Sequence, residues 1–83
     1  MGEFDRLREY LSKCEGTDLL ITFNKINEVI SPNHLPQEAY DSRNWWANTR
    51  GNPQACCWLG AGWRVATVNL IHREVNFTRR PEA

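Results

Sequence analysis

Two adjacent tryptophans, with arginines and an asparagine around them, are the residues best suited to binding chemistry in this chain. Trp45 and Trp46 are preceded by Arg43 and followed by Asn48 and Arg50. Neighbouring positions on a helix or strand do not share a face, so we expect at most one of the two indoles to be fully buried. The other would offer a flat ring on which a nucleic-acid base or a partner side chain could stack.

Arginines concentrate in the second half of the chain, while the first half carries the acidic excess. Between positions 41 and 80 there are six arginines against two carboxylates, although the net charge of the 83 residues is zero. A neutral chain is not expected to bind polyanions indiscriminately, because non-specific affinity comes from surplus basic charge. The asymmetry fits a one-sided basic surface, and a solvated surface of mixed charge is the alternative.

The candidate binding residues follow from these two patterns. Arg64 is expected to start a hairpin that folds back toward Arg43 and Arg50, which would bring the three charges to the tryptophan pair. Asn48 could read an adenine edge, although an asparagine beside a loop is more often a cap or turn residue. The predicted site for nucleic acid or a protein partner consists of Arg43, Trp45, Trp46, Asn48, Arg50 and Arg64.

Catalytic and metal-binding signatures do not stand out in the sequence. There is no Ser-His-Asp pattern, no carboxylate pair with catalytic spacing and no Gly-rich phosphate loop. Cys56 and Cys57 are adjacent, whereas zinc sites use Cys-x-x-Cys or a similar pair, so a site with His34 and His72 is not supported. A dyad of Cys57 with either histidine has no support from the spacing. We therefore expect a binding module that is not an enzyme and needs no cofactor.

Cysteine usage and hydropathy bear on the compartment. The three cysteines, Cys14, Cys56 and Cys57, are an odd number and include an adjacent pair, which favours reduced thiols in the cytoplasm. No run of 18 or more apolar residues predicts a membrane span, and the first residues do not resemble a secretory signal. The length fits one domain over residues 1–83, with residues 80–83 as a loose tail.

Hydrophobic periodicity and turn residues predict the elements that position the candidate site. They are a helix from residue 4 that stops near Gly16, a strand over 18–23, a helix around 26–30, a helix over 37–46, a helix over 53–60 and a hairpin of strands 63–70 and 74–79. Thr22 or Asn24 would cap the second helix, and Pro53 would begin the fourth. Val65 and Val68 break the alternation of the first hairpin strand, which indicates a β-bulge.

This order of elements resembles a small winged-helix-like α+β domain. We expect the strand at 20–23 to pair with the C-terminal hairpin and form a three-stranded antiparallel sheet, because an isolated hairpin is marginal in water. Trp58 and Trp63 lie among small and apolar residues, so we expect both in the core.

The chain also resembles a family of small bacterial domains of unknown function over roughly residues 18–79. The family pattern is an apolar-Thr-Phe start, Leu-Pro followed by Ala, Trp-Trp-x-Asn, a Trp in mid-helix, Gly-Trp-x-Val and a closing Val-x-Phe. In this chain these motifs are Ile21-Thr22-Phe23, Leu35-Pro36 with Ala39, Trp45-Trp46-Ala47-Asn48, Trp58, Gly62-Trp63-Arg64-Val65 and Val75-Asn76-Phe77. Glu38 stands where the family has a serine, so any capping or ligand role of that serine is not carried over.

The resemblance implies a setting in DNA transactions or phage defence, since such domains occur alone or beside nuclease-like domains. The leading hypothesis is a nucleic-acid-binding module, most of all for DNA. The alternative is a protein-binding module, for example a phage or mobile-element inhibitor of a bacterial defence complex. The charge asymmetry favours the first hypothesis, and the zero net charge favours the second.

Overall fold

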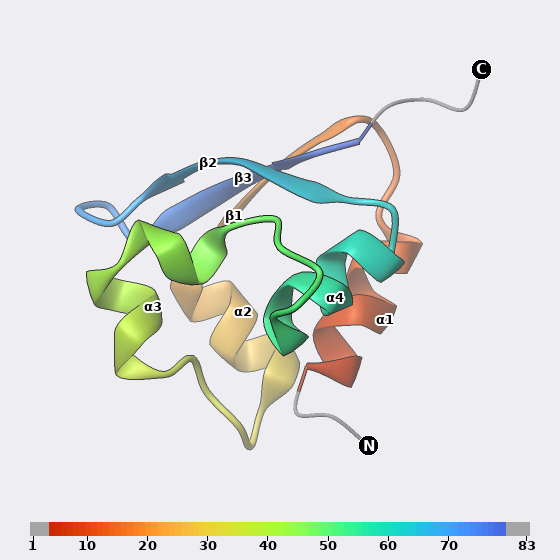
Figure 1. Cartoon of the computed structure of the whole chain (residues 1–83). Coiled ribbons are helices and arrows are strands. Elements are labelled where there is room, and N and C mark those ends of the chain that lie inside the picture. The colour runs from red at the N-terminus through yellow and green to blue at the C-terminus, as the bar shows by residue number, and fades with distance from the viewer. Residues whose placement is uncertain (1–3, 80–83) are drawn as a thin grey trace.

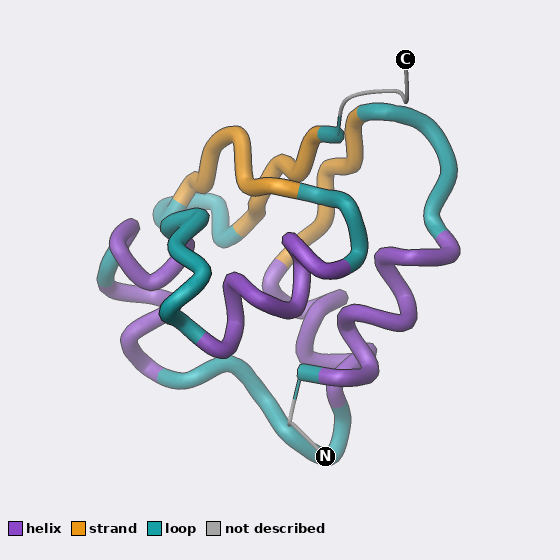
Figure 2. Tube along the Cα trace, turned by 45° about the vertical axis from the view of Figure 1, so that its right-hand side comes forward, coloured by secondary structure: helices purple, strands orange, loops and turns teal. Residues whose placement is uncertain are grey.

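A three-stranded antiparallel sheet lies over a layer of helices in the computed structural model, which describes residues 4–79 (Figure 1). In chain order the elements are α1 (Asp5–Lys13), β1 (Asp18–Thr22), α2 (Phe23–Ile30), α3 (Gln37–Asp41), the 3-10 helix η1 (Arg43–Trp46), α4 (Pro53–Gly60), β2 (Arg64–Asn69) and β3 (Glu74–Thr78). The described helices all lie on one side of the sheet (Figure 2). The architecture is the predicted α+β class.

The strand order in the sheet is β1-β3-β2, so the last strand of the described chain is the middle one. Val75 of β3 lies opposite Ile21 of β1 and opposite Val68 of β2, and both pairings are antiparallel. The predicted pairing of the first strand with the hairpin is confirmed. The register shifts between Val65 and Thr67, which places the bulge where the sequence predicted it.

Local capping residues explain where several elements begin and end. The Thr22 hydroxyl accepts a hydrogen bond from the Lys25 backbone N–H at 3.1 Å, so Thr22 is the cap of α2. Pro53 opens α4, as predicted. The first helix already ends at Lys13, and Gly16 lies in the following turn with a positive φ of 87°, a conformation that glycine adopts readily.

The predicted helix over residues 37–46 is wrong, because the chain breaks it at Ser42. The backbone of Ser42 is extended, with φ at −133° and ψ at 125°, and its hydroxyl accepts a hydrogen bond from the Asn44 N–H at 3.2 Å. A serine side chain that bonds to the backbone in this way competes with helical hydrogen bonding. The result is a short α3 followed by the separate turn η1, which carries the tryptophan pair.

Aromatic rings form the centre of the core between the helices and the sheet. The ring of Trp46 lies between those of Phe23 and Trp58, with centroid distances of 5.0 Å and 5.8 Å and nearly parallel planes. Trp58 in turn contacts Phe77 of β3 at 5.8 Å. Trp58 and Trp63 are both almost completely buried, which confirms the predicted core. The stack therefore links α2, η1, α4 and the sheet in one cluster.

Each deeply buried indole N–H has a hydrogen-bond acceptor, as burial of a tryptophan requires. Trp46 donates to the Ala39 carbonyl at 2.9 Å, which ties η1 to α3. Trp63 donates to the Leu11 carbonyl at 2.8 Å, which ties the start of β2 to α1. These bonds fix the direction of each ring and so define one arrangement of the core.

The longest helix within residues 4–79 is α1, with nine residues, and none of the described helices has the length and apolarity needed to cross a bilayer.

Replacing Trp58 tests the core directly. We expect Trp58→Ala to lower the free energy of unfolding by about 3–5 kcal/mol, the range for large aromatic truncations in cores. Such a loss is a large part of the stability of a small domain, so a Trp58→Ala variant that is already unfolded at the start of the thermal melt also agrees with this prediction. Thermal melting followed by circular dichroism measures it. Ile71→Ala is the matched control, since Ile71 is 89% exposed and its loss should change little. Equal melting of the two variants would contradict the core assignment.

Candidate functional site

The predicted stacking surface is wrong, because both members of the tryptophan pair are buried. Trp45 is 8% exposed and Trp46 is 1% exposed. The two rings meet edge to face at 4.7 Å. Trp45 reaches Phe4 at 5.9 Å, while Trp46 reaches Phe23. Both rings also contact Trp58 of α4, so both pack into the core and neither remains for a base.

The Asn48 side chain joins the loop after η1 to the free edge of β2 by hydrogen bonds. Its side-chain oxygen accepts hydrogen bonds from the Trp58 indole N–H at 3.0 Å and from the Val65 backbone N–H at 2.9 Å. Its amide nitrogen donates to the Val65 carbonyl at 2.9 Å. The amide thus pairs with Val65 as a neighbouring strand would. One amide hydrogen remains, which is too few for the bidentate contact that reads adenine.

The three hydrogen bonds of the Asn48 side chain form what we call the clamp. Three arginines line a hollow beside the clamp, and we call this hollow the arginine hollow. It has a volume of about 370 Å³ and is lined by Asn48, Arg50, Leu59, Gly62, Trp63, Arg64 and Arg79. No carboxylate is among these residues, so the hollow carries positive charge alone. Arg50 and Arg64 therefore line the same hollow, whereas Arg43, which the sequence analysis grouped with them, does not.

Arg79 belongs to the same hollow, and the sequence reasoning did not include it in the site. Its guanidinium lies 4.5 Å from the centre of the Trp63 ring, and its Nε donates to the Gly16 carbonyl at 2.6 Å. Thr78, the residue before it, pairs with Arg64 across the hairpin. Counting the register outward from the hairpin turn was the signal that could have found Arg79.

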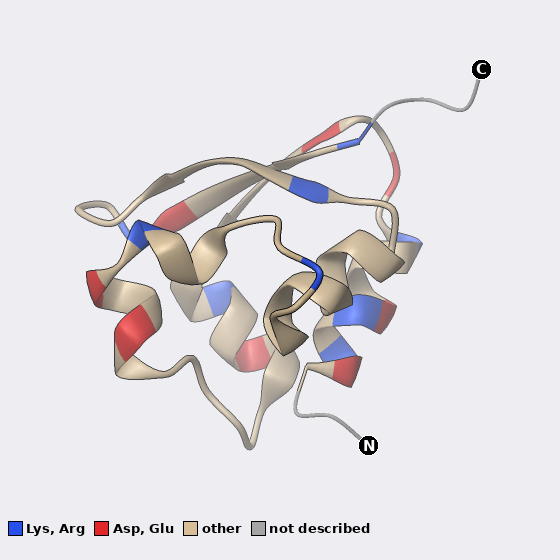
Figure 3. Cartoon of the chain, viewed as in Figure 1, with Lys and Arg blue, Asp and Glu red and all other residues tan. Residues whose placement is uncertain are grey.

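Arg43 lines a second hollow, which we call the β2-edge hollow. This hollow has a volume of about 480 Å³ and is lined by Arg43, Trp46, Ala47, Asn48, Val65, Ala66, Thr67 and Val68. Asn48 lines both hollows, so the two are neighbours along β2. In Figure 3, basic residues occur on η1, on β2 and on the loop before α4, and neither β2 nor that loop carries an acidic one.

The remaining basic residues are arranged differently. Arg73, in the hairpin turn, lies 5.2 Å from the centre of the Tyr40 ring and lines neither hollow. Arg80 lies outside the described residues. Ion pairs within residues 4–79 include Lys13 with Glu9 on α1 and Lys25 with Glu28 on α2.

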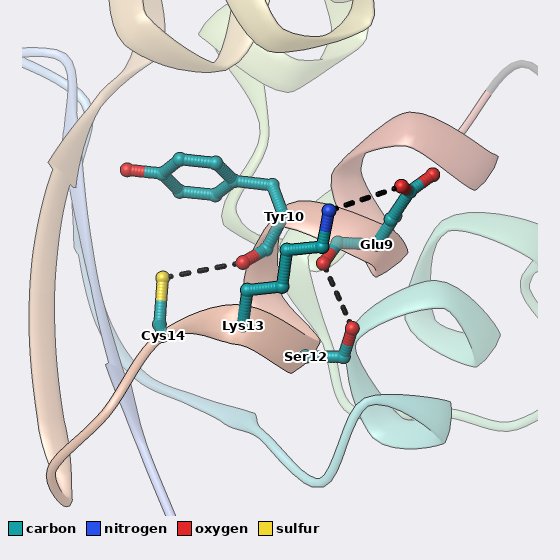
Figure 4. A network of polar contacts seen from close by, with 5 residues as sticks. All are labelled: Glu9, Tyr10, Ser12, Lys13 and Cys14. Carbon is teal, nitrogen blue, oxygen red and sulfur yellow. Dashed lines mark hydrogen bonds and ion pairs between the residues drawn. The ribbon is translucent and has the colours of Figure 1, made fainter.

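Figure 4 shows the first of these ion pairs, at 3.2 Å, at the end of α1. Arg43, Arg50 and Arg64 take part in no ion pair within the described chain, which leaves their charges available to a ligand.

The cysteines are free thiols in different environments. Cys57 is buried and its Sγ donates to the Phe4 carbonyl at 3.2 Å, while Cys56 is exposed. Burial raises the pKa of the Cys57 thiol to about 12, against a smaller opposing effect of Arg8. The thiol is therefore protonated at neutral pH and a poor nucleophile. In the described part of the chain no group of three His, Cys, Asp or Glu residues is placed to hold a metal ion.

The clamp makes a stability prediction that differs from a binding role for Asn48. We expect Asn48→Ala to lower the free energy of unfolding by about 1–2 kcal/mol, because three partly exposed hydrogen bonds are lost and the Trp58 N–H loses its acceptor. Asn44→Ala is the matched control, since Asn44 is exposed and its side chain makes no hydrogen bond within residues 4–79. Urea unfolding followed by tryptophan fluorescence compares them. Equal urea midpoints for both variants and the parent would show that the clamp does not contribute to the stability of the fold.

Comparison with known proteins gives the family. A family model described as a domain of unknown function, DUF7662, matches residues 4–81. This range includes the stretch over which the sequence resembled a family of such domains. No curated protein and no solved structure matches the chain. Because the match covers nearly the whole sequence, the chain belongs to the DUF7662 family of domains of unknown function.

Proposed function

We propose that this domain is a non-enzymatic module that binds nucleic acid, DNA above all, through phosphate groups. The observation that carries the proposal is the arginine hollow, in which Arg50, Arg64 and Arg79 gather without a carboxylate. Arginine forms charge-assisted, often bidentate hydrogen bonds with phosphate oxygens. Arg43 in the adjoining hollow would extend the same basic surface along β2.

The burial of the tryptophan pair changes how such binding would work. Single-stranded nucleic acid is usually held by stacking bases on exposed aromatic rings, and both Trp45 and Trp46 are turned into the core. Asn48 is occupied by its own clamp. The remaining groups are guanidinium ions, which contact phosphates and carry little sequence information. We therefore propose binding to the backbone with weak sequence preference.

A protein partner is the second candidate, and two exposed apolar side chains favour it. Ile71 in the hairpin turn is 89% exposed, and Leu20 on β1 is 64% exposed. Large apolar residues at a protein surface can mark an interaction site when they form a patch. An inhibitor of a bacterial defence complex would be one such module. The arginine cluster favours nucleic acid over this alternative.

We also propose that the domain acts in the cytoplasm. Its three free cysteines fit a reducing compartment, since secreted domains of this size usually rely on disulfides.

Salt dependence tests the nucleic-acid proposal. The two hollows supply four arginines as phosphate ligands. The slope of log affinity against log salt on duplex DNA should then reach a magnitude of about 3.6, with a negative sign. At that slope, affinity falls about a hundredfold between about 50 and about 200 mM salt. Arg50→Gln should weaken binding and flatten the slope by about one unit. Fluorescence anisotropy with labelled duplex DNA, single-stranded DNA and RNA measures both.

Lys13→Gln is the charge-matched control for this titration. Lys13 pairs with Glu9 on the exposed side of α1 and lines neither hollow, so its loss should leave the slope unchanged. Absence of binding to all three nucleic acids at the lower salt would rule out the proposal and favour the protein partner.

A further inference from the structure

The arginine hollow gathers more positive charge than a single backbone phosphate requires. Arg50, Arg64 and Arg79 carry three guanidinium ions around a hollow of about 370 Å³. A phosphodiester within a strand carries one negative charge and two free oxygens. A phosphate monoester carries nearly two charges at neutral pH and three acceptor oxygens. The charge and the number of donors in this hollow therefore match a monoester better than a diester.

One of the three arginines is held in place before any ligand arrives. Arg79 stacks over Trp63 and donates its Nε hydrogen to the Gly16 carbonyl. Its two terminal nitrogens make no hydrogen bond within the described chain, so they remain free to donate. An arginine fixed in this way loses less side-chain entropy on binding than a mobile one.

The other two arginines approach from separate parts of the backbone. Arg64 begins β2 and is held in the ladder opposite Thr78. Arg50 comes from the loop that Asn48 ties to Val65. Because the clamp joins this loop to the strand, Arg50 and Arg64 are kept on the same hollow. Arg43 is the single charged residue among the described residues that line the β2-edge hollow, so the accumulation of charge is confined to one side of the clamp.

We propose that the arginine hollow is a site for a phosphate monoester and, given the proposed binding to nucleic acid on which this rests, for the terminal phosphate of a strand end. Arg50, Arg64 and Arg79 would contact the terminal phosphate, and Arg43 would contact a phosphate farther along the strand. The domain would then distinguish a phosphorylated end from a hydroxyl end, while it ignores the base sequence.

Two DNA duplexes that differ only in a 5′-phosphate or a 5′-hydroxyl test this inference, with the fluorophore at the far end. We expect about tenfold tighter binding of the phosphorylated duplex, equivalent to about 1.4 kcal/mol. Arg64→Gln should abolish the difference. Arg43→Gln should weaken both duplexes alike and preserve the ratio. Circular dichroism of each variant confirms that it is folded. A 3′-phosphate on the same duplex shows which end is preferred, and equal affinity for all three duplexes overturns the inference.

The pH dependence gives an independent measurement. The second ionisation of a phosphate monoester has a pKa of about 6, whereas arginine stays charged throughout. The terminal phosphate loses charge below that value, so the preference for the phosphorylated duplex should shrink between pH 7 and pH 5. A preference that does not change over this range would contradict recognition of the second charge.

The outcomes separate this inference from the proposed function. Salt-dependent binding of both duplexes with equal affinity overturns the terminal-phosphate site and leaves nucleic-acid binding in place. Binding to neither duplex at low salt overturns both. A mononucleotide with a 5′-phosphate, used as competitor, distinguishes the source of the phosphate. Displacement by this mononucleotide at the same concentration as by the phosphorylated duplex would overturn the assignment to strand ends.

Discussion

The constraint on which this structure depends is that each deeply buried indole N–H needs a hydrogen-bond acceptor. The ring stack occupies the centre of the core, and a hydrogen bond outside the stack fixes each deeply buried tryptophan. The bond from Trp58 is the one that reaches the surface, because its acceptor is the side chain of Asn48. The same side chain then pairs with Val65. A requirement of the core therefore sets where a surface loop lies, and the loop in turn sets where Arg50 is presented.

The sequence predicted the layers of the fold better than the positions of individual side chains. The positions of the strands, the bulge near Val65 and the cap at Thr22 depend on local patterns that act within a few residues, so they could be anticipated. The break at Ser42 could not, because residues 37–46 look helical unless the serine hydroxyl is known to bond to the backbone. That break decides the outcome for the tryptophan pair. In the 3-10 turn η1 the two adjacent indoles contact each other and Trp58, so both are interior.

The candidate site shows the same division between local and non-local information. The approach of Arg50 to Arg64 followed from the expected hairpin and loop, whereas the contribution of Arg79 depends on how the ends of β2 and β3 meet. Net charge gave a poor guide to this surface. The ten acidic and ten basic residues cancel over the whole chain, yet the arginine hollow holds three charges of one sign. Local charge, screened beyond about 10 Å in ordinary salt, is what a bound phosphate would experience.

The position of β3 in the sheet has a consequence for the order of folding. β3 is the middle strand, although it is the last described element to be synthesised, so β1 and β2 have no ladder partner until it emerges. The pairing of Asp18 with Thr78 closes a contact between nearly opposite ends of the described chain. Contacts of such long sequence separation raise the contact order and slow folding. A nascent chain that lacks β3 can form helices, but its edge strands stay unpaired and open to association with other chains.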